Sequence, residues 1–113
     1  MAKKKTINLQ RAYSRFNRLY FDNDLPKDAV IQWANLEGLD RWAQCIFCGK
    51  SARRFDRVYI EISEELRYCS RTALFSLLHE MSHLQPPCVV THGKEFDRRM
   101  LSLAKRGAFT GIW

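Results

Sequence analysis

Apolar side chains recur at helical spacing near both ends of the chain. Between Asn8 and Asp22 they return every three or four positions, which predicts an amphipathic helix. The same spacing predicts a last helix over residues 93–106, with Gly107 as its natural stop. The expected apolar faces are Leu9, Ala12, Phe16, Leu19 and Tyr20 in the first helix, and Phe96, Met100, Leu103 and Ala104 in the last.

Three segments between these helices have the composition of β-strands. They are residues 29–34, 42–48 and 57–63. In the third segment Val58, Ile60 and Ile62 occupy alternate positions, the pattern of a strand with one buried side. Residues 49–56 would then form a long basic loop between the second and third strands.

A further helix is expected after the third strand. Ser63 can cap its start, a break is expected near Ser70, and Pro86 and Pro87 end it after Gln85. One helix, three strands and two more helices, in that order, predict an α+β fold in which the helices pack on a small, mostly antiparallel three-stranded sheet.

Length and composition suit one globular domain and exclude intrinsic disorder, since 46% of the 113 residues are hydrophobic. We expect a single domain over 1–113, with basic residues 1–6 as a flexible N-terminus. Nineteen Lys and Arg against twelve Asp and Glu give a net charge of +7, which favours a polyanionic partner. Without a membrane-length apolar run or a secretory signal, we expect a cytoplasmic protein, nuclear in a eukaryote, and no membrane partner.

The informative motif is His79-Glu80-Met81-Ser82-His83. On a helix, residues four apart lie on the same face, so His79 and His83 can bind one metal ion while Glu80 lies beside it. Catalytic zinc sites use three protein ligands and keep one position open, and His92 is the available third ligand. The motif therefore predicts one Zn²⁺ per chain, bound by His79, His83 and His92, with Glu80 as the catalytic base.

The stretch FSLLHEMSH (75–83), followed by HGKEF (92–96), resembles the core of the SprT-like zinc metallopeptidases, the family that includes Spartan. Residues 19–26, 30–38 and 58–63 are similar to that family's first helix end and strands. The resemblance implies a minimal zincin-like fold whose active-site helix carries the H-E-x-x-H motif. It also implies a protease that hydrolyses peptide bonds in DNA-associated or DNA-crosslinked proteins, as in DNA–protein crosslink repair.

Two other functions remain open. The chain can be a non-catalytic DNA- or protein-binding module that keeps zinc as a structural staple, although such a site has no need of Glu80 beside the open metal position. It can also be a regulator of the repressor-cleaving zincin type. The His-Gly-x-x-Phe element at residues 92–96 favours the SprT-like interpretation over that one. The oligomeric state stays open.

Four basic clusters are candidates for contact with DNA, and for each cluster alone a solvated surface is the simpler interpretation. Together with the net charge and the resemblance they favour DNA binding. Phe55 and Trp42 would be available to stack on bases. The basic clusters are Lys3–Lys5; Arg11, Arg15 and Arg18; Arg53, Arg54 and Arg57; and Arg98 and Arg99.

The chain has four cysteines, of which Cys45 and Cys48 form a C-x-x-C pair. A four-cysteine zinc site would show a second close pair, whereas Cys69 and Cys88 lie far apart in the sequence. Because no secretory signal is present, we expect free thiols rather than disulfides or a second metal site.

Overall fold

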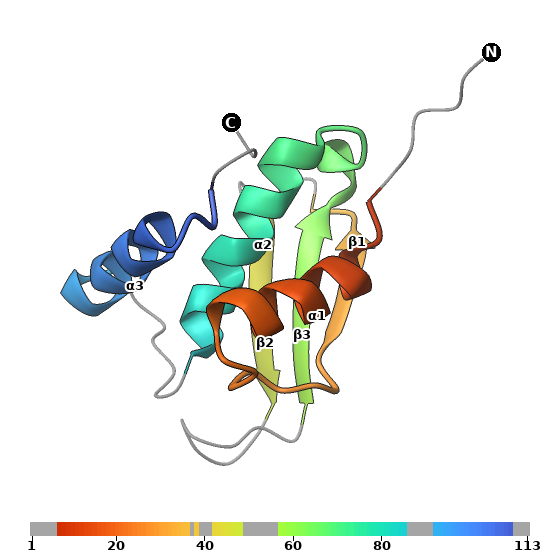
Figure 1. The fold of residues 1–113 in the computed structure, drawn as a ribbon. Coiled ribbons are helices and arrows are strands. Elements are labelled where there is room, and N and C mark those ends of the chain that lie inside the picture. The colour runs from red at the N-terminus through yellow and green to blue at the C-terminus, as the bar shows by residue number, and fades with distance from the viewer. Residues whose placement is uncertain (1–6, 37, 39–41, 49–56, 86–91, 110–113) are drawn as a thin grey trace.

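The computed structural model describes residues 7–36, 38, 42–48, 57–85 and 92–109, with 46–48 and 57 described by their backbone alone. These residues form an α+β domain, as predicted (Figure 1). Its elements are α1 (Leu9–Tyr20), β1 (Val30–Ala34), β2 (Ala43–Cys48), β3 (Arg57–Ser63), the short 3₁₀ helix η1 (Glu64–Leu66), α2 (Ser70–Leu84) and α3 (Lys94–Lys105).

The sheet is mixed, so the prediction of a mostly antiparallel sheet is wrong. Its strand order is β1-β3-β2, in which β1 runs parallel to β3 and β2 runs antiparallel to it. Alternating apolar residues identify a strand but carry no information on its direction. The central strand is β3, and its alternating Val58, Ile60 and Ile62 are all buried on the covered face of the sheet.

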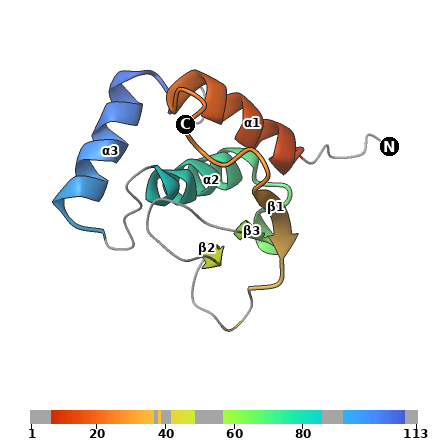
Figure 2. The same ribbon diagram turned by 90° about the horizontal axis from the view of Figure 1, so that it is seen from below.

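The domain has two layers. Helices α1 and α2 lie over the same face of the sheet, and α3 lies beside α2 on the side away from β1 (Figure 2). The core fills the space between sheet and helices, with Tyr13, Ile60, Leu77 and Met81 among its fully buried side chains. None of the helices in the described ranges is long and apolar enough to cross a membrane.

Helix α1 begins where the sequence predicted and ends slightly earlier. The Asn8 side chain caps it by accepting a hydrogen bond from the Arg11 N–H, at 3.0 Å. Its buried face is shifted from the expected one, because Leu19 is 40% exposed whereas Tyr13 and Asn17 are buried. The hydroxyl of Tyr13 donates to the Pro26 carbonyl, which ties the buried side of the helix to the segment that follows it.

The expected break near Ser70 is confirmed. Ser63 caps η1 by accepting from the Glu65 N–H, and α2 starts only at Ser70. Helix α3 ends at Lys105, and Gly107 has a φ of +82°, as expected for a helix stop. On its expected apolar face, Ala104 is exposed and Arg99 is buried instead.

Replacing Asn17 with Ala should lower the free energy of unfolding by about 2–3 kcal/mol. The buried amide of Asn17 accepts from the Leu25 N–H and donates to the Leu25 carbonyl, both at 3.1 Å, and alanine leaves both backbone groups unsatisfied. Urea denaturation would measure the loss. Ser14→Ala, at an exposed position of the same helix, is the control and should change little; equal stabilities of the two variants would refute the assigned role.

Candidate metal centre

Two consecutive turns of α2 and the residue before the N-cap of α3 supply the candidate ligands. His79 and His83 lie four residues apart on α2, which brings both rings to the same side of the helix. His92 directly precedes Gly93, the N-cap of α3, so the position of α3 determines where the third ring lies.

The three rings converge as the sequence predicted. Nε2 of His92 lies 3.1 Å from Nε2 of His79 and 3.2 Å from Nε2 of His83. One ring nitrogen from each of the three residues lies within 4.8 Å of the others. In the part of the chain that the structure describes, no other group of three or more His, Cys, Asp or Glu is suitably placed to hold a metal ion.

These separations suit zinc. Two nitrogens that each lie about 2.05 Å from a tetrahedral zinc ion are about 3.3 Å apart. Hydrogen bonding alone explains the cluster less well, because Nε2 of a neutral imidazole offers either one proton or one lone pair, and Nε2 of His92 faces two other ring nitrogens. A cation between the three nitrogens would accept a lone pair from each ring.

Phe96 packs against all three histidines. Its ring stacks on His83 at 4.5 Å between centroids, and it lies 4.8 Å from His79 and 4.9 Å from His92. Phe96 is itself buried, in the first turn of α3. The aromatic residue of the His-Gly-x-x-Phe element is therefore the packing surface that all three candidate ligands share.

The electrostatic environment keeps His79 neutral. Burial, together with the neighbouring His83 and His92, lowers the pKa of His79 to about 4. A neutral imidazole has the free lone pair that metal binding requires. At neutral pH His79 is therefore ready to bind a cation without first losing a proton.

Glu80 follows His79 on α2, and only 6% of its surface is exposed. A carboxylate is rarely buried to this extent unless it is bonded to a partner or has a functional role. Its position therefore agrees with the sequence-based choice of Glu80 as a functional group rather than a solvated surface residue.

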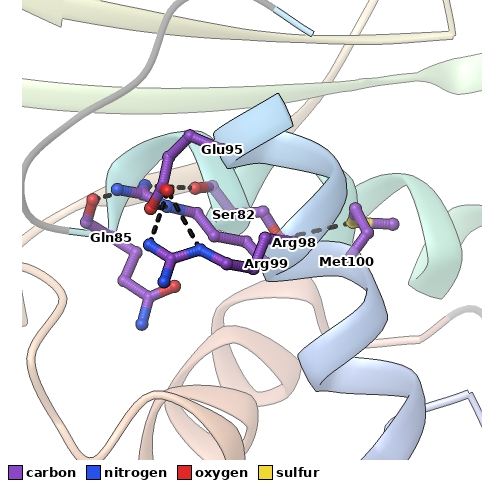
Figure 3. A network of polar contacts seen from close by, with 6 residues as sticks. All are labelled: Ser82, Gln85, Glu95, Arg98, Arg99 and Met100. Carbon is purple, nitrogen blue, oxygen red and sulfur yellow. Dashed lines mark hydrogen bonds and ion pairs between the residues drawn. The ribbon is translucent and has the colours of Figure 1, made fainter. Parts of the chain in front are cut away.

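Sequence reasoning missed the role of Arg99, which we had grouped with Arg98 as a candidate for DNA contact. The guanidinium of Arg99 is buried, and its Nη1 donates to the carbonyls of Ser82 and Gln85 (Figure 3). Arg98 is exposed, but Glu95 binds both arginines, and these hydrogen bonds lower the pKa of the Glu95 carboxyl. The sequence did hold a sign that Arg99 is buried, because residue 99 falls on the face of α3 that carries Phe96 and Leu103.

The other candidate residues whose side chains the structure describes are not part of this centre. Arg11, Arg15 and Arg18 are exposed on α1, and Trp42 is 54% exposed. Cys45 and Cys69 are free cysteines, as expected. The remaining candidates lie outside the description, either entirely or in their side chains: Lys3–Lys5, Arg53, Arg54, Phe55, Arg57, Cys48 and Cys88.

Comparison of the sequence with models of known protein families finds no match, and comparison with curated proteins finds none either. A function for this chain therefore has to be inferred from the chemistry of His79, Glu80, His83 and His92.

Replacing His92 with Ala should weaken zinc binding by more than the roughly 10–100-fold that follows loss of an outer-shell partner. Only the two imidazoles of α2 would remain, and zinc would lack its third protein ligand. Competition with a chromophoric chelator measures the affinity, and Lys94→Ala, two residues away and exposed, is the control. Wild-type affinity in His92→Ala would exclude His92 as a ligand.

Proposed function

We propose that this chain is a zinc-dependent peptidase of the SprT-like kind that acts on DNA-associated proteins. The observation that carries the proposal is the convergence of three imidazole nitrogens, two of them from α2, the helix that also bears the buried Glu80. Three histidines are the protein donor set of catalytic zinc sites, which keep the fourth position for water or substrate.

In this proposal His79, His83 and His92 hold the zinc ion. When bound there, zinc supplies a Lewis acid that lowers the pKa of a water molecule to about 7. Glu80 accepts a proton from the attacking water and later delivers it to the leaving amine. Phe96 keeps the imidazole rings packed together and excludes water from one side of the centre.

The peptide substrate adds as an extended strand to the β2 edge of the sheet. Two strands lie at the edges, β1 and β2, and of these β2 packs against α2. At β1 the edge is partly occupied, because the Gln10 side chain donates to the Ala29 carbonyl at 2.9 Å and accepts from the Ile31 N–H at 3.1 Å. These are the two hydrogen bonds that one residue of a neighbouring parallel strand would make. The arrangement favours capture of an extended substrate at β2.

A basic face on α1 supports the DNA-associated part of the proposal. Arg11, Arg15 and Arg18 are exposed and lie on one side of α1 at helical spacing. Among the described residues, the acidic groups in ion pairs are bound to other arginines. Arginines without an acidic partner can neutralise phosphates, and the net charge of +7 acts in the same direction.

Replacing Glu80 with Gln should abolish most proteolysis while leaving zinc content unchanged. Glutamine keeps the shape of the side chain and all three histidines, but it cannot accept the proton, and general acid–base assistance is worth about 10²–10⁴-fold. Wild-type and variant protein would be assayed in parallel for zinc content and for cleavage of a DNA-bound protein. Equal cleavage by both would exclude Glu80 as the base, and zinc binding with no cleavage by wild type would favour the non-catalytic module.

Replacing Arg11, Arg15 and Arg18 together with Gln should weaken binding to every duplex sequence alike. If each arginine neutralises one phosphate, the slope of log affinity against log salt should fall by about 2.7, or 0.9 for each contact. Fluorescence anisotropy over a salt series measures both effects. Arg98→Gln is the control, because Glu95 already binds Arg98. If wild type fails to bind duplex DNA at about 50 mM salt, DNA is not a partner.

A further inference from the structure

Helix α3 is fastened to the ends of the two other helices by two arginines, Arg99 within it and Arg106 at its C-cap. Arg99 donates through Nη1 to the carbonyls of Ser82, at 2.9 Å, and Gln85, at 2.6 Å, at the end of α2. Arg106 donates through Nη1 to the Tyr20 carbonyl at 2.8 Å and through Nη2 to the Leu19 carbonyl at 3.3 Å, at the end of α1. Seven residues separate the two arginines, so they lie on one side of α3.

These contacts satisfy backbone groups that a helix leaves without partners. The last four carbonyls of an α-helix have no intrahelical donor, and a buried carbonyl without a hydrogen bond is destabilising. The guanidinium fork of Arg99 serves two carbonyls at once and also donates through Nε to Glu95 Oε1 at 3.1 Å. Figure 3 shows the Glu95 carboxylate between Arg98 and Arg99, with Arg99 extending onward to Ser82 and Gln85.

This network joins the two parts of the metal centre. Ser82 is adjacent in sequence to His83, and Glu95 lies three residues after His92. The side chains of Arg99 and Glu95 therefore connect the turn of α2 that carries His83 with the first turn of α3. The position of that first turn determines where His92 lies. By comparison, Arg106 holds the far end of the same helix against a part of the domain that bears no candidate ligand.

We propose that Arg99 is a positioning residue for the metal centre: it fixes α3 against the end of α2 and thereby holds His92 opposite His79 and His83 before the metal arrives. The inference rests on the metal site of the proposed function. A centre whose ligands are already in place binds its metal more tightly, because less conformational entropy is lost on binding.

Arg106 provides a matched control for a merely structural role. Arg99 lies on α3 and Arg106 caps its end. Both donate to terminal carbonyls of another helix, and each also contacts a carboxylate, Glu95 or Asp22. Replacing either with Gln should lower the thermal stability of the metal-free protein. Only Arg99→Gln should also weaken zinc binding, by about tenfold, the lower end of the range for outer-shell residues.

The experiment compares wild type, Arg99→Gln, Arg99→Lys and Arg106→Gln by thermal unfolding without metal, zinc competition with a chelator, and the visible absorption of bound Co²⁺. Arg99→Lys should bind zinc with intermediate affinity, because lysine keeps the charge but lacks the fork that serves two carbonyls and Glu95 together. The Co²⁺ spectrum of Arg99→Gln should differ from that of wild type, and that of Arg106→Gln should not.

If Arg99→Gln does not fold, Glu95→Gln loosens the same network from its more exposed end and should weaken zinc binding in the same direction.

Wild-type zinc affinity in the folded Arg99 variants, or an equal loss in Arg99→Gln and Arg106→Gln, would overturn the inference while leaving the peptidase proposal intact. Zinc binding that depends on Arg99 without any proteolysis would overturn the peptidase and support the positioning role. A wild-type chain that binds neither zinc nor Co²⁺ would overturn both.

Discussion

Helix α2 is buried along most of its length, yet its last two turns carry four polar side chains. Glu80, Ser82 and His83 are all buried, and His79 is half-buried. Polar groups removed from water must find other partners, and this requirement shapes the surroundings of α2. Ser82 donates back to the Leu78 carbonyl, His83 stacks on Phe96, and the helix end receives the guanidinium of Arg99. Two of these partners, Phe96 and Arg99, come from α3, so this helix both packs its apolar side on the domain and supplies partners to the polar end of α2.

The helices and strands could be predicted from the chain because their apolar residues follow the period of each element. Val58, Ile60 and Ile62 marked β3, and the spacing of Leu9 and Phe16 marked α1. Strand direction could not be predicted in this way, because alternation is identical in parallel and antiparallel strands. Strand β3 lies between β1 and β2 although it follows both of them in the sequence. Its parallel pairing with β1 therefore depends on the chain returning from β2 to the centre of the sheet.

For the site, sequence spacing placed His79 and His83 together because helix geometry is local. The approach of His92 was an expectation from the order of motifs, and the ring nitrogens do meet. Arg99 was misjudged as a surface residue, and Tyr13 and Asn17 were left out of the expected buried face, for a common reason. Each is a polar or amphipathic residue that is buried and donates a hydrogen bond to a backbone carbonyl outside its own helix. From residue type alone, such side chains are expected at the surface. They are buried here because the fold brings a backbone carbonyl within reach of each one, which the sequence does not show.

The amide of Gln10 has a consequence for self-association. A small sheet with two exposed edges can pair with further copies at both sides, which permits open-ended stacking of chains. Here one side chain fills hydrogen-bonding positions of β1 that an incoming strand would need. If two copies were to pair through β2, both outward edges of the joined sheet would be β1 edges, each already engaged by its own Gln10. Growth by edge pairing would then stop at a closed twofold pair rather than continue into a fibre.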